Sequence, residues 1–161
     1  MPRIFVNIGS NIEPRVNILK SLDALREKFG ELQVSKCYES EAVGFEGDNF
    51  LNLSAGFITD LSVTEVNREL HSIEDTAGRE RLHGKAWDSR TLDIDMLLYG
   101  DMCGSVEGVE LPRPEILEFA HVFFPLCELA GSVIHPKLGI SFARLLLETE
   151  FIGQSIWEVS L

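Results

Sequence analysis

Two aspartates, Asp93 and Asp95, stand two positions apart inside the otherwise apolar run 92–99. Side chains alternate between the two faces of a strand, so both carboxylates would project from one face, opposite the wholly apolar face made by residues 92, 94, 96 and 98. Neighbouring residues on one face lie roughly 7 Å apart, and two carboxylates at that spacing repel each other unless a cation lies beside them. Magnesium, which binds carboxylates, water and phosphate oxygens, would answer that need. An isolated D-x-D pattern more often marks plain solvent-facing alternation, so the neighbouring residues must decide.

A basic segment precedes the aspartates in this otherwise acidic chain. Within twelve residues it carries Arg79, Arg81, Lys85 and Arg90. Guanidinium groups match phosphate oxygens, so the segment favours a magnesium-bound polyphosphate as ligand. The alternative is a solvated charged loop, because Glu80 and Asp88 dilute the positive charge.

Composition excludes several classes of function. The net charge of −12 over 161 residues argues against nucleic acid as a partner. Three widely spaced cysteines (Cys37, Cys103 and Cys127) argue against a disulfide framework and favour a reducing, cytoplasmic location. No apolar stretch approaches the ~20 residues of a membrane span. The chain carries neither a P-loop nor a GxGxxG motif, so a nucleotide would need a different cradle.

The elements that must position these residues follow from periodicity. Strands are predicted at 4–8, 32–40, 50–60 and 92–99. Helices are predicted from Pro14 to Gly30 and over 62–78, where Ser62 and Glu65 form a capping box. A last helix is predicted within 141–150, after a buried apolar segment at 122–130.

This order predicts a single α+β domain spanning residues 1–161. The arrangement strand, helix, strand, strand, helix, strand is typical of a ferredoxin-like antiparallel sheet. We expect the helices to pack on one face, with a C-terminal appendage after the fourth strand. The second face would then be free, and a ligand site carrying the aspartates could lie on it.

Several blocks of the sequence together resemble the 6-hydroxymethyl-7,8-dihydropterin pyrophosphokinase family. They are IGSN, YESEAVG, NFLN, IEDTAGRER and W-x-x-RTLDIDMLLYG, in matching order from residue 4 to about residue 130. The resemblance implies a ferredoxin-like fold. It also implies an ATP-dependent enzyme of folate biosynthesis that transfers the β,γ-pyrophosphoryl group of ATP to the pterin hydroxymethyl group and releases AMP.

The resemblance also implies roles for individual residues. Asp93 and Asp95 would bind two Mg²⁺ ions and, with three arginines, act in catalysis: Arg79, Arg81 and Arg90. ATP would be bound by a further set: His71, Glu74, Trp87, Leu111 and Arg113. The pterin would be bound by Ser40, Val43, Phe50, Asn52 and His121.

Four positions depart from the family's pattern. Arg113 stands where a histidine is usual, Phe119 where an arginine is usual, and His121 where a stacking phenylalanine is usual. On the second helix, His71 stands where a glutamine is usual. These departures leave open a related transferase acting on a different pterin alcohol. A non-catalytic pterin- or nucleotide-binding domain is a further alternative, although it would not need both aspartates. We expect small-molecule substrates only, and a monomer or weak homodimer.

Overall fold

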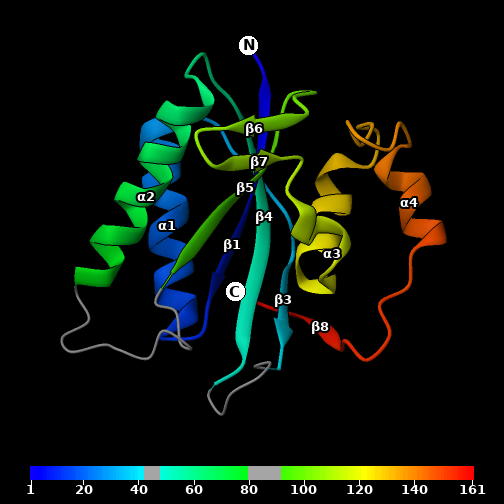
Figure 1. Cartoon of the computed structure of the whole chain (residues 1–161). Coiled ribbons are helices and arrows are strands. Elements are labelled where there is room, and N and C mark those ends of the chain that lie inside the picture. The colour runs from blue at the N-terminus through cyan, green and yellow to red at the C-terminus, as the bar shows by residue number, and fades with distance from the viewer. Residues whose placement is uncertain (42–47, 80–91) are drawn as a thin grey trace.

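The computed structural model describes residues 1–41, 48–79 and 92–161, and its centre is an antiparallel sheet (Figure 1). The strand order is β5-β1-β4-β3-β8, and the short strand β2 also pairs with β4. The strands are β1 (Arg3–Ser10), β2 (Gln33–Val34), β3 (Cys37–Ser40), β4 (Phe50–Ile58), β5 (Asp93–Tyr99) and β8 (Ile156–Val159). All four predicted strands are therefore present, the second of them interrupted between β2 and β3.

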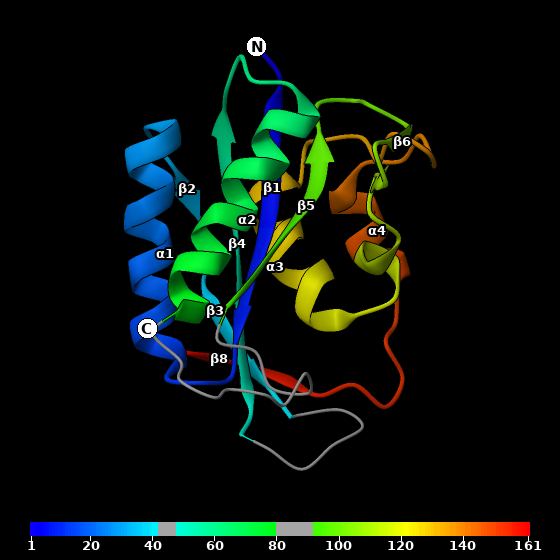
Figure 2. The ribbon, with the colours of Figure 1, turned by 60° about the vertical axis from the view of Figure 1, so that its left-hand side comes forward.

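Two helices cover one face of this sheet, α1 (Pro14–Phe29) and α2 (Val63–Arg79) (Figures 1 and 2). Both were predicted from their apolar stripes. Pro14 begins α1 and Gly30, with φ of 83°, ends it. Leu22 and Leu70 are among the residues that join the two helices and the sheet in one buried core. This layer holds the helix face of β1 and β5 in place.

The capping box at the start of α2 is confirmed. The backbone N–H of Glu65 donates to Oγ of Ser62 over 3.2 Å, and the backbone N–H of Ser62 donates to Oε1 of Glu65 over 3.0 Å. Hydrogen bonding to the Glu65 carboxyl by the Ser62 backbone N–H, and then by the Ser62 side chain, lowers the pKa of that carboxyl. The reciprocal pair satisfies two backbone donors that have no partner inside the helix.

The second face is not free, which corrects the expectation that the helices pack on one face only. Helix α3 (Ala120–Ala130) lies against β4 and β3 on that face, with α4 (Phe142–Glu148) beside it (Figure 1). The apolar segment 122–130 is the body of α3, and its Phe123 is fully buried with Phe5 of β1 in a second core. The expectation failed because it treated this apolar segment as an appendage, whereas it needs a sheet face to cover it.

A bulge in β5 corrects the predicted alternation of that strand. Phe5 pairs with Leu98 while Val6 pairs with Met96, so Leu97 is an extra residue between them. Leu98 therefore joins Leu97 in the core of the second face. Tyr99 packs on the helix side, where its hydroxyl donates to the carbonyl oxygen of Leu61 over 2.6 Å. Asp93 and Asp95 precede the bulge and keep the face that was predicted for them.

The remaining elements follow β5. Strands β6 (Gly104–Val106) and β7 (Val109–Leu111) pair with each other, and a short 3₁₀ helix, η1 (Pro114–Leu117), leads into α3. The last helix lies within the predicted range, at α4, and β8 then returns to pair with β3. Among the described residues, no helix combines the length and apolarity needed to cross a membrane.

Candidate active site

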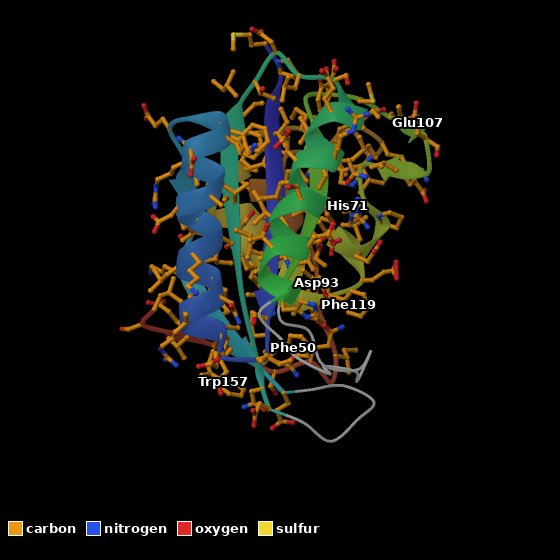
Figure 3. The ribbon with its side chains drawn as sticks, turned by 90° about the vertical axis from the view of Figure 1, so that its left-hand side faces the viewer. Phe50, His71, Asp93, Glu107, Phe119 and Trp157 are labelled. Atoms are coloured by element: carbon orange, nitrogen blue, oxygen red, sulfur yellow. The ribbon has the colours of Figure 1, made fainter. Side chains whose placement is uncertain are left out.

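A cavity of about 720 Å³ opens on the second face of the sheet, beside the start of α3. Its floor comes from β1, β4 and β5, and its sides come from β3, from residues 113–122 and from the segment 153–156. Figure 3 labels three of its residues, Phe50, Asp93 and Phe119, which lie toward the same end of the molecule. The lining is mixed, with carboxylate, amide, guanidinium and aromatic groups in one hollow.

Asp93 and Asp95 both line this cavity, as their alternation on the strand predicted. Their nearest neighbours on β1 are the residues that pair with them across the strands: Gly9 pairs with Asp93, and Asn7 pairs with Asp95. Burial raises the pKa of the Asp95 carboxyl; the charge of Arg113 opposes that rise and the charge of Glu115 adds to it. A bound cation would stabilise the charged form of a carboxylate whose pKa is raised by burial. Two carboxylates on one face of a strand are suitable ligands for a hard metal ion such as Mg²⁺.

Glu74 reaches the edge of the same strand from α2. Its Oε2 accepts a hydrogen bond of 2.7 Å from the backbone N–H of Ile94, which lies between the two aspartates. Burial above all, together with the charges of Asp93 and Asp95, raises the pKa of Glu74 to about 7, against the lowering effect of the hydrogen bond from Ile94. The three carboxyl groups thus concentrate negative potential at the start of β5.

Arg113 brings a positive charge to the cavity. Its Nε donates to the carbonyl oxygen of Met96 over 2.8 Å, and its Nη1 lies 3.4 Å from Oε2 of Glu115. The first bond anchors the guanidinium against β5, so its charge acts on the nearby Asp95. Arg113 therefore interacts with two carboxyl groups that line the cavity, those of Asp95 and Glu115.

The predicted pterin-binding residues described by the structure lie at the other side of the cavity. Ser40, Phe50, Asn52 and His121 all line it. Asn52 is 4% exposed, and its Oδ1 accepts a hydrogen bond of 3.1 Å from Nδ2 of Asn7. A planar ligand would meet hydroxyl and amide groups at its edge and aromatic rings at its faces.

Two of the departures from the family's pattern touch each other. The rings of Phe119 and His121 stack with centroids 5.3 Å apart and an interplanar angle of 27°. Burial lowers the pKa of His121, so its imidazole is neutral at neutral pH and offers an uncharged ring to the cavity. Phe119 is 39% exposed, which leaves part of its face open.

Two other predicted residues that the structure describes, His71 and Leu111, do not line this cavity, although the charge of His71 opposes the rise in the pKa of Asp95. His71 lies on the exposed side of α2, in a shallow hollow with Arg68 and Asp75, and Figure 3 shows it away from the cavity aromatics. Leu111 is 2% exposed and packs in the core of the helix side. Arg79 is the last residue of α2. Four predicted residues lie outside the described part of the chain: Val43, Arg81, Trp87 and Arg90.

The cavity also contains residues that sequence reasoning missed. Asn7 and Glu115 line it, and so do residues 153–156, which come from the far end of the chain. Asn7 carried a signal, since it is the polar residue within the apolar strand 4–8. The segment 153–156 carried none, because only the return of β8 to β3 brings it to the site.

Comparison with known proteins identifies the family. The model of the 7,8-dihydro-6-hydroxymethylpterin-pyrophosphokinase (HPPK) family matches residues 5–131. A 2-amino-4-hydroxy-6-hydroxymethyldihydropteridine pyrophosphokinase of Aquifex aeolicus is 33% identical over 138 residues, which cover 84% of this chain and 85% of the relative. The enzyme of the same name from Pseudomonas aeruginosa is 33% identical over 156 residues, 94% of each chain.

Solved structures agree at the level of the fold. The HPPK-DHPS protein of Plasmodium falciparum, solved with pterin and p-hydroxybenzoate, matches with a TM-score of 0.70 at 13% identity. The match covers 91% of this chain and 43% of that one, so the chain spans less than half of that longer protein. Because the family model matches most of the chain and the two relatives align over most of their own length, the chain belongs to the 7,8-dihydro-6-hydroxymethylpterin-pyrophosphokinase family.

Proposed function

We propose that the protein uses this cavity to transfer pyrophosphate from ATP to 6-hydroxymethyl-7,8-dihydropterin in folate biosynthesis. The hydroxymethyl oxygen forms a bond to the β-phosphorus of ATP and loses its proton. The bond from the β-phosphorus to the oxygen that bridges to the α-phosphorus breaks, and AMP leaves. The observation that carries this proposal is one cavity that joins a carboxylate pair on β5 to a polar and aromatic pocket on β3, β4 and α3.

Asp93 and Asp95 are the groups that would hold Mg²⁺, as two ions. The raised pKa of Asp95 supports this role, because a buried carboxylate of this kind is stabilised by a cation. Bound magnesium would neutralise charge on the triphosphate, which is the main demand of such a transfer. Glu74 supports the pair by holding the Ile94 N–H, which fixes the strand between the two carboxylates.

The pterin would lie on the other side of the cavity. Asn52 and Ser40 would bond its polar edge, since both are buried and carry groups that can donate and accept. Phe50 and His121 would contact its two faces, a use of neutral aromatic rings that burial of the imidazole supports. Val43 is proposed to add to this site.

ATP would meet the cationic side of the site. Arg113 supports this assignment, because its guanidinium is anchored to the Met96 carbonyl and lines the cavity beside Asp95. Phe119 stands where an arginine is usual in the family and offers no charge there, so Arg113 carries more of the contact with phosphate. Further residues proposed to assist ATP or the transfer are His71, Glu74, Arg79, Arg81, Trp87, Arg90 and Leu111.

The proposal extends to the fold type, the number of domains, the oligomeric state and the cellular location. The order β5-β1-β4-β3 fits the ferredoxin-like arrangement predicted from the sequence. The chain is proposed to act as one domain, since the cavity uses residues from Asn7 to Ile156. A monomer suffices for such a site, although a weak homodimer is compatible with it. The cysteines Cys37, Cys103 and Cys127 are free, which fits a cytoplasmic location.

One assay tests the activity. The protein is incubated with ATP, Mg²⁺ and 6-hydroxymethyl-7,8-dihydropterin, and AMP is measured with and without the pterin. Pterin-dependent AMP release is the expected result. AMP release only with another pterin alcohol would favour the related transferase, which the unusual residues 113, 119 and 121 suggest. Pterin binding without AMP release from any of these alcohols would favour the non-catalytic domain.

A further inference from the structure

Asn7 is a buried amide in the central strand of the sheet. It is 5% exposed and sits between the apolar residues Val6 and Ile8 of β1, on the face that carries the cavity. A buried amide costs free energy unless it is hydrogen-bonded, and a smaller apolar residue would fill this position without that cost. Its presence therefore points to a use in the cavity.

Asn7 makes one hydrogen bond to a residue of the proposed pterin site. Its Nδ2 donates to Oδ1 of Asn52 over 3.1 Å, in a fully buried pair. Asn52 leans over Gly9 to make this contact, because a Cβ on Gly9 would lie only 2.5 Å from that same Oδ1. The missing side chain at residue 9 thus leaves the space in which the two amides meet.

The contact determines what Asn52 offers to a ligand. An asparagine side chain has one acceptor oxygen and one donor nitrogen. With Oδ1 turned toward Asn7, Nδ2 is on the opposite side of the amide, where its N–H groups can donate to a ligand. An edge of the pterin that presents a carbonyl oxygen or an unprotonated ring nitrogen would match this polarity.

We infer that Asn7 is a positioning and specificity residue, which holds the Asn52 amide so that its nitrogen faces an acceptor atom of the pterin. This inference rests on the proposed function. The contact would act on pterin binding through Asn52. Because Asn7 also pairs across the strands with Asp95, the magnesium dependence of binding is the readout that separates an effect through Asn52 from an effect on the metal ligands.

A second observation bears on the same residue. Oδ1 of Asn7 is buried and has no hydrogen-bond partner among the residues that the structure describes. Asn7 pairs across the strands with Asp95, whose carboxylate can accept a hydrogen bond but cannot donate one. In this orientation the nitrogen of Asn7 is hydrogen-bonded to Asn52 while its oxygen is left without a partner in the described part of the chain. The cost of the unpaired oxygen is accepted, which indicates that the contact with Asn52 is the one with a function.

The test measures pterin affinity directly. Titration of 6-hydroxymethyl-7,8-dihydropterin in the presence of Mg²⁺ and a non-hydrolysable ATP analogue is compared for wild type, Asn7→Ala and Asn7→Leu. Loss of this hydrogen bond is expected to weaken pterin binding about tenfold, and Asn7→Leu, which is similar in size and adds no charge opposite Asp95 but cannot donate, should weaken it at least as much. The magnesium dependence of binding should stay unchanged in both.

The matched control is Asn17→Ala. Asn17 is also a buried amide that donates a hydrogen bond, to the Ile12 carbonyl oxygen over 2.6 Å, but it lies on α1, across the sheet from the cavity. This variant should lose thermal stability and keep its pterin affinity. A structural role for Asn7 would make its variants behave like Asn17→Ala, and that result would overturn the inference.

A double-mutant cycle completes the test. If Asn7 acts through Asn52, adding Asn7→Ala to Asn52→Ala should weaken pterin binding little further. Additive losses would overturn the inference, as would a changed magnesium dependence, which would place the effect at Asp95. The readout is binding, so the test does not depend on turnover. If the wild-type protein binds pterin without releasing AMP, the proposed transfer is refuted, but the pterin affinities of the Asn7 variants can still be compared. Wild type that does not bind pterin would overturn both.

Discussion

Oδ1 of Asn52 lies 2.5 Å from the point that a Cβ on Gly9 would occupy. No Cβ atom tolerates a neighbour at that distance, so a side chain at residue 9 and the present position of Asn52 exclude each other. The atom in the way is the end of a side chain, which can move at less cost than backbone. Gly9 therefore serves the site more than the stability of the sheet.

Gly9→Ala is expected to fold and to bind pterin about tenfold more weakly, because the Asn52 amide loses a hydrogen bond when it is displaced. The matched control is Gly56→Ala on β4, where a Cβ would meet the Phe5 ring at 3.0 Å in the second core. That variant should lower the melting temperature and leave pterin affinity unchanged. Weakened binding in Gly56→Ala but not in Gly9→Ala would contradict the reading of Gly9.

Asp95→Asn should remove most of the turnover while making the metal-free protein slightly more stable. The raised pKa of Asp95 means that its charged form is less favourable in the folded protein than in the unfolded protein, and a neutral amide removes this cost. The amide is, however, a weaker magnesium ligand than the carboxylate, so turnover should fall. AMP release and melting temperature in metal-free buffer are the two measurements. Asp101→Asn, at an exposed aspartate after β5, should change neither. Wild-type turnover in folded Asp95→Asn would refute the metal assignment.

Glu74 should make the stability of the metal-free protein depend on pH. The pKa of its carboxyl is about 7 in the folded state against an ordinary value of 4.5, so the folded state retains the proton longer than the unfolded state. Its favourable contribution is complete below about pH 4.5 and is lost as the pH rises through about 7. Melting curves of wild type and Glu74→Gln should therefore separate over this interval, with wild type becoming relatively less stable. Parallel curves would show that the carboxyl is not buried in this way.

His121 should give pterin binding a pH dependence at acidic pH. Its pKa is lowered from 6.5 by burial, so the imidazole becomes charged only below that value. The charged ring stacks less well on a neutral pterin, and affinity should fall as the pH drops below about 6.5. His121→Phe should bind at least as tightly and with a flatter pH profile. Identical profiles in pterin titrations would place His121 away from the pterin ring.

The local elements and the carboxylate pair were predictable from the sequence. These features depend on interactions between near neighbours in the chain, which produce a regular spacing of apolar residues in the sequence. They are the capping box at Ser62 and Glu65, the helices of the first face and the side of β5 that carries Asp93 and Asp95. The blocks from IGSN to RTLDIDMLLYG also indicated the family to which the chain belongs.

Only the tertiary structure decided how the second face is used. Helix α3 covers part of that face because its apolar residues must be buried somewhere, and no local pattern states against which strand. The bulge at Leu97 moves Leu98 to the opposite side, since one inserted residue reverses the alternation beyond it. The hydrogen bond from Asn7 to Asn52 joins residues 45 positions apart, and such a contact exists only after β1 has paired with β4.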